Sequence, residues 1–248
     1  MSFPSTHSRS IPILTYHQIA RAPAKGAPFR GLCVAPDAFG RQMAGLKMLG
    51  FRGLSMTDLM PYLRGERFGK VVGITFDDGY LNNLTAALPV LRRHGFTSTC
   101  YVVSQLLGQT NLWDREGGVG QTSLMDAPQL RQWVAGGQEV GAHTRHHVHL
   151  KQIDADTGRR EIAQSRAELE AIVQAPVQHF CYPYGEFDHD HTQMARDAGY
   201  LSATTTRRGR CQPQDELMQL PRVPVLRSTT LLSFWLKVST TYEDRRRT

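Results

Sequence analysis

Two adjacent carboxylates, Asp77 and Asp78, follow an apolar stretch rich in β-branched residues, 71–76. Neighbouring carboxylates repel each other unless a cation or a proton neutralises one of them. Asp-Asp-Gly is also a favourable turn sequence, so the pair taken alone fits a surface turn as well as a chemical role. The chemical hypothesis gives one aspartate to a metal ion and leaves its neighbour to act as a base.

Four of the ten histidines, His143, His146, His147 and His149, occur within seven residues. Side chains at the spacing of His143 and His147 can converge on one ion from a helical turn or a tight loop. Two imidazole nitrogens and one carboxylate form a zinc site with a position left open for water. We expect His146 and His149 to face solvent or to support the ligands. The alternative is a solvated loop whose histidines are unrelated.

Alternating strand and helix patterns must position these residues. Short β-branched runs are typical of buried strands, and amphipathic segments at three- to four-residue spacing are typical of helices. The alternation predicts a parallel α/β fold in one domain, either an open doubly wound sheet or a barrel. The expected strands are 11–16, 71–76, 97–103, 139–142, 177–182, 201–205 and 222–226, and the expected helices are 39–49, 81–94, 130–135, 154–173 and 189–198.

Functional residues of a parallel α/β fold lie where strands end and loops begin. Four polar groups occupy predicted carboxyl ends: His17, the aspartate pair, the histidine cluster and the segment Tyr182-Pro-Tyr184. A lone histidine such as His17 is more often structural than catalytic, but its place on this edge favours a chemical role. The sequence therefore predicts one site built from four loops.

Charge and cysteine content exclude several classes of protein. The formal net charge is +7, yet the basic residues are scattered and no run interleaves them with aromatic residues, so no nucleic-acid partner is expected. The four cysteines lie far apart without a CxxC pair, which predicts reduced, buried thiols. The first residues lack the features of a signal peptide, which predicts a cytoplasmic location. The apolar stretch 231–238 is expected to pack on the barrel as a final helix, with peripheral membrane contact as the alternative.

At these residues the chain resembles the polysaccharide deacetylases with a NodB homology domain, carbohydrate esterase family 4. Thr75-Phe-Asp-Asp-Gly79 matches the first family motif completely. His143-Thr-Arg-His-His147 matches the second motif, His-Ser/Thr-x-x-His, and Cys181-Tyr-Pro-Tyr184 stands where the third, Arg-x-Pro-Tyr, is expected. The resemblance spans about residues 11–225, nearly the whole chain.

The resemblance implies a distorted (β/α)7-type barrel with the NodB homology fold. Its single domain would cover residues 11–228, followed by a C-terminal helix and basic tail at 229–248. It also implies a divalent metal, zinc foremost and cobalt or nickel as alternatives, held by Asp78, His143 and His147.

Two further roles carry over from the family's motifs. Asp77 would be the general base, and the backbone N–H of Tyr184 would help to stabilise the oxyanion.

Three family motifs depart from the usual pattern. The third-motif arginine that orients the catalytic aspartate is Cys181 here, and our hypothesis is that Arg222 supplies the guanidinium from the last strand. The fourth motif, Asp-x-x-Asp-Trp, is not recognisable, and no histidine follows His191 to form the fifth, which carries the general acid. Tyr16-His17 is similar to the N-terminal Tyr-His of circularly permuted members resembling poly-N-acetylglucosamine deacetylases. That similarity implies that His17 is the acid.

The expected function is therefore metal-dependent removal of N-linked acetyl groups from an acetylated amino-sugar glycan or its lipid-linked precursor. An O-acetyl esterase or another amide hydrolase on the same metal site is the first alternative. A non-catalytic carbohydrate-binding protein that retains the fold is the second. The sequence does not identify the sugar or the oligomeric state.

Overall fold

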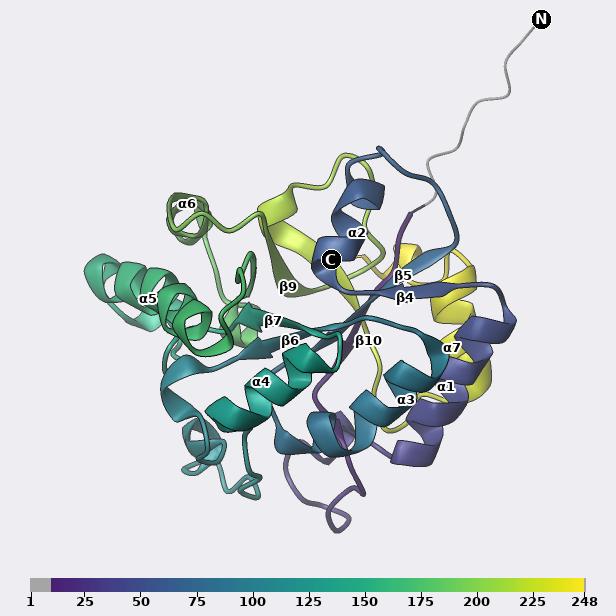
Figure 1. The fold of residues 1–248 in the computed structure, drawn as a ribbon, viewed down its shortest axis with the longest axis horizontal. Coiled ribbons are helices and arrows are strands. Elements are labelled where there is room, and N and C mark those ends of the chain that lie inside the picture. Colours follow the sequence, from purple (N-terminus) through teal and green to yellow (C-terminus); the bar gives the residue numbers. More distant parts are fainter. Residues whose placement is uncertain (1–9, 248) are drawn as a thin grey trace, which may run out of the picture.

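A computed structural model describes residues 10–247, in which seven parallel strands close into a barrel surrounded by helices (Figure 1). The strand order is β1-β10-β9-β8-β7-β6-β5, and β1 closes the ring by pairing with β5, with Leu14 opposite Ile74. This confirms the predicted (β/α)7-type barrel. The strands are β1 (Ile13–Tyr16), β5 (Val71–Phe76), β6 (Thr99–Val102), β7 (Glu139–Ala142), β8 (His179–Cys181), β9 (Ser202–Arg208) and β10 (Leu220–Pro224).

Helices follow most strands and cover the outside of the barrel (Figure 1). They are α1 (Pro36–Met48), α2 (Met56–Leu63), α3 (Leu88–His94), α4 (Ala127–Ala135), α5 (Ala155–Val173), α6 (His189–Asp197) and α7 (Leu231–Ser239). A π-helical segment, η2 (Asn83–Ala87), precedes α3. Single 3₁₀ turns are η1 (Arg30–Leu32), η3 (Ser104–Leu106), η4 (Leu112–Asp114), η5 (Leu150–Gln152), η6 (Pro183–Gly185), η7 (Leu217–Gln219) and η8 (Asp244–Arg246).

Local sequence explains how α5 and α4 begin. Asp154 accepts a hydrogen bond from the Thr157 N–H and caps α5, as its position before the helical pattern predicts. Asp126 and Gln129 form a capping box at the start of α4, so this helix begins three residues before the predicted bound. The two caps fix the direction in which the preceding loops lead into α4 and α5.

Three short strands and one helix have no counterpart in the predicted elements. The strand β4 (Arg52–Leu54) adds to β5 outside the closed ring, and β2 (Gln18–Ile19) pairs with β3 (Cys33–Val34) beside the barrel. Gly53 interrupts the apolar run in β4, and Pro61 lies inside α2, so neither segment carries a clear pattern. Gly53 leaves room for its neighbours, because a Cβ would lie 2.8 Å from the Phe96 ring.

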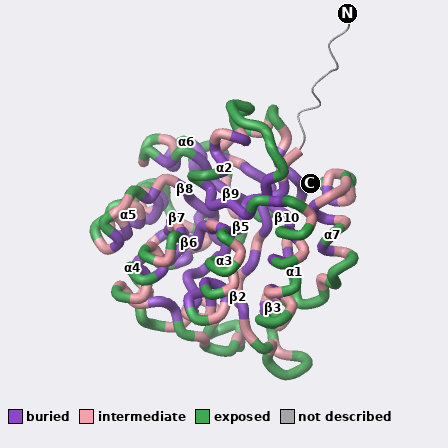
Figure 2. The backbone as a smooth tube through the Cα atoms, turned by 45° about the vertical axis from the view of Figure 1, so that its right-hand side comes forward, coloured by how far each residue is buried: buried purple, intermediate pink, exposed green. Residues whose placement is uncertain are grey.

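The core consists of two layers, because alternate strand residues point into the barrel and out towards the helices. Tyr16 and Phe76 stack outside the barrel at 5.6 Å, and Trp133 of α4 packs edge-on against Phe76. Ile13 and Tyr101 belong to the second, smaller cluster. Figure 2 shows the buried backbone concentrated along the strands.

The cysteines and the final helix behave as expected. All four cysteines are free and buried. The last predicted helix is present as α7, which buries Phe234 and Val238 and packs beside α1. Within residues 10–247, no helix has the length and apolarity that crossing a membrane requires.

Candidate active site

The loops that follow β5, β7 and β8 contain residues with strained backbone conformations. Six described non-glycine residues have positive φ, and four of them lie in these loops: Asp78 (75°), Thr144 (61°), His147 (58°) and Tyr184 (57°). Such conformations cost free energy for residues with a side chain and persist where the surroundings enforce them, commonly at functional sites. The chain is therefore bent to aim particular side chains at one place.

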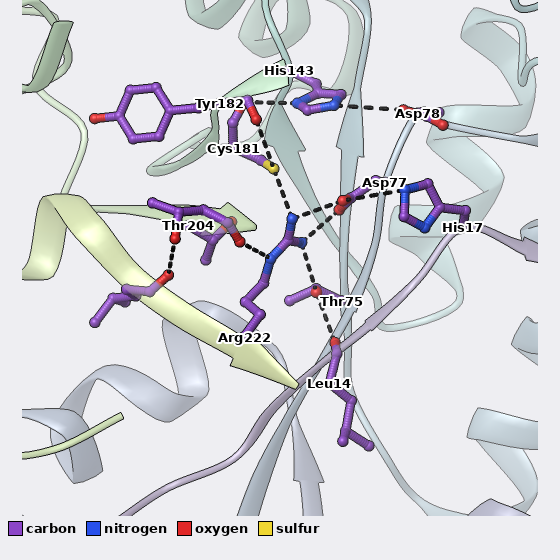
Figure 3. Close-up of polar contacts among 12 residues, drawn as sticks. Leu14, His17, Thr75, Asp77, Asp78, His143, Cys181, Tyr182, Thr204 and Arg222 are labelled. Carbon is purple, nitrogen blue, oxygen red and sulfur yellow. Dashed lines mark hydrogen bonds and ion pairs between the residues drawn. The ribbon is translucent and has the colours of Figure 1, made fainter. Parts of the chain in front are cut away.

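Asp77 is buried against Arg222, which reaches it from β10 (Figure 3). The guanidinium donates from Nη1 to Oδ1 at 2.7 Å and from Nη2 to Oδ2 at 2.8 Å. Its remaining N–H groups donate to the Thr205 carbonyl at 2.9 Å, to Thr75 Oγ1 at 3.2 Å and to Cys181 Sγ at 3.2 Å. All five donors of the side chain are thus engaged, which fixes the Asp77 carboxylate in one orientation.

Three buried side chains converge beside this pair. The Oδ1 atom of Asp78 lies 3.5 Å from Nε2 of His143 and 3.4 Å from Nε2 of His147. One ligand atom from each residue lies within 4.8 Å of the others. The three residues therefore present two imidazole nitrogens and a carboxylate oxygen to a common point, a donor set that suits zinc.

Both histidine rings are oriented with Nε2 towards Asp78. Nδ1 of His143 donates to the Cys181 carbonyl oxygen at 2.7 Å, which turns Nε2 towards Asp78. Burial lowers the pKa of His143, but Cys181 and Asp78 outweigh this effect and raise the pKa. Burial lowers the pKa of His147 and favours its neutral imidazole. These observations fit a bound divalent ion.

Both aspartates are ionised despite their burial. Burial alone raises the pKa of each carboxyl group. For Asp77 the charge and hydrogen bonds of Arg222 outweigh this effect and lower its pKa. For Asp78 the hydrogen bonds from His143 and His147 hold the pKa well below its ordinary value. At neutral pH the site therefore holds two carboxylates, one paired with a guanidinium and one with imidazoles.

His17 follows β1 and lies on the other side of Asp77. Its Nε2 atom is 3.9 Å from Asp77 Oδ2, and a quarter of its side chain is exposed. Asn83 donates from Nδ2 to the His17 carbonyl oxygen at 3.0 Å, which ties this loop to the helical segment after Asp78. The structure thus places His17 at the edge of the same site, in reach of a substrate beside Asp77.

Aromatic rings form one wall of the site. Trp113 stacks on the His147 ring at 4.3 Å, and Tyr184 packs edge-on against it at 4.6 Å. Tyr184 also stacks on His149 at 3.9 Å. Gly185 makes this turn possible, because its φ is 71° and a Cβ at this position would collide with the Thr206 side chain. The wall orients His147 and offers flat apolar surface to a substrate.

A cleft of about 500 Å³ joins these groups. It contains every residue of the predicted site, and so the structure brings them all together. The functional groups that line it are His17, Asp77, Asp78, His143, His147, Tyr184 and Arg222, together with Phe29, Tyr80, Trp113 and Asp114. This volume suits a small organic segment with one group inserted beside Asp78, His143 and His147.

Sequence reasoning missed Trp113, Asp114 and Glu161. Trp113 and Asp114 lie on a loop between β6 and α4 that carries no motif, so only the fold brings them to the cleft. Glu161 lies on α5 and accepts hydrogen bonds from the backbone N–H groups of Arg145 and His146. In the sequence it is one of several acidic residues on a charged helix.

Comparisons with known proteins identify the family of this chain. The chain is 25% identical over 217 residues to YxkH of Bacillus subtilis, covering 87% of this chain and 71% of that protein. It is 23% identical over 215 residues to the poly-β-1,6-N-acetyl-D-glucosamine N-deacetylase of Staphylococcus epidermidis, covering 82% of this chain and 72% of that one.

Among solved structures, the deacetylase PplD of Streptococcus pyogenes superposes with a TM-score of 0.81 at 24% identity, over 93% of this chain and 99% of that one. This likeness supports the barrel fold. A sequence model of the family described as polysaccharide deacetylase matches residues 64–203, more than half of the chain. The match includes the aspartate pair, the histidine cluster and the turn at Tyr184. This protein belongs to the polysaccharide deacetylase family.

Proposed function

We propose that the protein is a metal-dependent N-deacetylase of an amino-sugar glycan, of the class represented by poly-β-1,6-N-acetylglucosamine. The observation that carries the proposal is the Asp77 carboxylate, held by Arg222 between His17 on one side and the cluster of Asp78, His143 and His147 on the other. A base, an acid and a metal site then surround one cleft. Together these three groups can hydrolyse an unactivated amide.

Asp78, His143 and His147 would hold the ion. When bound, a divalent ion supplies water with a pKa lowered towards about 7 and polarises the acetyl carbonyl. Asp77 accepts the proton of the attacking water. Although both of its oxygens bind Arg222, each keeps a second lone pair for this proton.

The remaining steps fall to His17 and Tyr184. Attack on the carbonyl places negative charge on its oxygen, and the backbone N–H of Tyr184 helps to stabilise that charge. His17 gives a proton to the amine nitrogen as the carbon–nitrogen bond breaks. Acetate and the free amino sugar leave the cleft, and no covalent enzyme intermediate is needed.

Acetate release from short β-1,6-linked N-acetylglucosamine oligomers tests the proposal. We expect release that stops after chelation and returns when zinc or cobalt is added.

Asp77→Asn should keep the metal but lower turnover by about 100-fold or more, as for the loss of a general base. An O-acetylated sugar assayed in parallel separates the two hydrolase classes. Faster release from the ester, with none from the amide, would replace the proposal by an O-acetyl esterase.

A further inference from the structure

Basic side chains gather at the end of the barrel opposite the cleft. We define the basal face by seven basic and two apolar residues, which are Lys47, Arg52, Arg64, Arg67, Lys70, Arg92 and Arg93 with Met48 and Phe68. They lie in the last turns of α1 and α3, at the start of β4, or between the end of α2 and the start of β5, and so at the amino-terminal ends of the strands. In Figure 1 the loop between α2 and β5 projects at this end, near the top of the view.

Hydrogen bonds join these segments into one surface. Lys47 donates from Nζ to the His94 carbonyl oxygen at 3.3 Å, which links α1 to the end of α3. Lys70 donates from Nζ to the Leu49 carbonyl oxygen at 2.6 Å, and the Arg52 N–H donates to the Lys70 carbonyl oxygen at 2.9 Å. The loop before β5, the start of β4 and the ends of two helices therefore form a continuous patch.

The basal face carries most of the net charge of the protein. Segments 47–70 and 92–94 contain seven Lys or Arg residues but only Asp58 and Glu66 as acidic residues, against +7 for the whole chain. All seven basic side chains are exposed. Within residues 10–247 none of them takes part in an ion pair, whereas Arg208, Arg210 and Arg222 each pair with a carboxylate. The charge is therefore available to an anionic partner.

Two exposed apolar side chains, Met48 and Phe68, lie among the basic residues of the basal face. Met48 is 84% exposed and Phe68 is 78% exposed, the highest values among the large apolar side chains of the described residues. Each lies within two residues of the Lys70–Leu49 contact. Cations that surround projecting apolar residues are typical of proteins that lie on an anionic bilayer, where the charges meet phosphates and the apolar groups enter the acyl boundary. A nucleic acid would satisfy the charges but would leave Met48 in water.

We propose that the basal face docks on an anionic phospholipid bilayer. The strand β5 and its flanking residues separate Lys70 from Asp77, a rise of about 20 Å. Docking therefore turns the cleft away from the lipid. If the deacetylase function proposed above is correct, the enzyme would act on glycan that extends outward from the membrane surface rather than on groups within the headgroup layer.

Co-sedimentation of the full chain with vesicles tests the docking. Vesicles of phosphatidylglycerol and phosphatidylcholine should bind the protein at low salt, and pure phosphatidylcholine vesicles should not. Arg64→Glu with Arg67→Glu should lower binding by at least tenfold, because neither side chain makes a described contact whose loss would unfold the protein. The matched control, Arg159→Glu with Arg160→Glu on α5, changes the net charge equally and should bind nearly as the wild type does.

The apolar residues receive their own variant. Met48→Ser with Phe68→Ser should reduce binding severalfold while leaving its salt dependence unchanged. The proposal would be overturned if the Arg64/Arg67 and Arg159/Arg160 variants lost vesicle binding equally. It would also be overturned if the Met48/Phe68 variant bound vesicles as the wild type does. Release of vesicles by duplex DNA at equal phosphate would assign the face to nucleic acid instead. Acetate release from soluble oligomers by the same variants should match the wild type, and this readout separates failed docking from failed catalysis.

Discussion

At the scale of single residues, the guanidinium that fixes Asp77 comes from Arg222 of β10 and not from residue 181. Residue 181, where the third family motif is expected to have arginine, is a cysteine. Its thiol sulfur accepts a hydrogen bond from the Arg222 guanidinium. The arginine comes from β10, two strands away from β8 in the ring. Because all strand ends meet at one edge, a guanidinium from either strand can reach Asp77. The orientation of Asp77 therefore depends on position in space rather than on motif order.

Arg222→Lys tests this orientation. An ammonium group cannot make two parallel hydrogen bonds to one carboxylate, so Asp77 should lose its fixed direction. We expect kcat for deacetylation to fall by about 10- to 100-fold, a part of the full contribution of a general base. KM and zinc content should change little, since Asp78 and the histidines keep their contacts. Wild-type kcat in this variant would remove Arg222 from the mechanism.

His17→Gln separates the leaving groups. An amine needs a proton to depart, whereas the alcohol of an ester leaves more easily. We expect a loss of about 100-fold in acetate release from N-acetyl oligomers. The loss on an activated acetyl ester should be much smaller, and the ratio of the two rates is the measurement. An equal loss on both substrates would mean that His17 does not act as the acid.

At the scale of elements, α5 holds the loop that carries two of the three metal-site residues. The buried Glu161 accepts from the N–H groups of Arg145 at 2.9 Å and His146 at 3.0 Å, and its second oxygen lies 2.6 Å from His146 Nδ1. Glu168, two turns further along, accepts from Arg145 Nε and Ser104 Oγ. The loop 143–149 has positive φ at Thr144 and His147 and forms no helix or strand. The side chain of Glu161 on α5 therefore accepts the backbone hydrogen bonds that regular structure would otherwise provide.

Glu161→Gln should loosen this loop. The amide keeps one acceptor oxygen but loses the negative charge that both N–H groups face. We expect zinc affinity to fall by about 10-fold or more, as for other partners that orient metal ligands. Titration against a competing chelator measures it. Glu168→Gln is the matched control on the same helix, because it contacts only side chains, and its zinc affinity should stay near that of the wild type. Equal affinities in the two variants would contradict the prediction.

The elements also show what sequence patterns could and could not predict. The strands at 71–76 and 139–142 were predicted with their observed bounds, and the other barrel strands within about three residues of theirs, because apolar runs are a local signal. The three-residue β4 and the proline-containing α2 carry no such signal and were missed. Asp78, His143 and His147 were recognisable by residue type and spacing. Trp113 and Glu161 were not, because their contacts depend on loops folding back across the barrel.

At the scale of the whole molecule, the C-terminal segment is tied to the barrel by ion pairs. Glu243 is fully buried and accepts from Arg208 at 2.6 and 2.9 Å and from Lys237 at 2.7 Å. Asp244 binds Arg210 at 2.7 Å. Both arginines lie at the end of β9 or just after it, and β9 precedes the strand that delivers Arg222. The final residues therefore stabilise the part of the barrel that supports the orientation of Asp77.

Glu243→Gln should destabilise the protein in a pH-dependent manner. Burial raises the pKa of Glu243, but the bonds from Arg208 and Lys237 outweigh it, so its pKa lies below the ordinary value. A carboxyl group whose pKa is lower in the folded state adds stability above the unfolded pKa of about 4.3 and loses it as the pH falls through the folded value. At pH 7 the variant should lose about 3 kcal/mol of unfolding free energy, because the buried ammonium of Lys237 no longer faces the negative charge of Glu243. Denaturant unfolding at pH 7 and at pH 3 measures the difference between wild type and variant, which should shrink in acid. A difference that stays constant between these pH values would show that shape, and not charge, makes Glu243 stabilising.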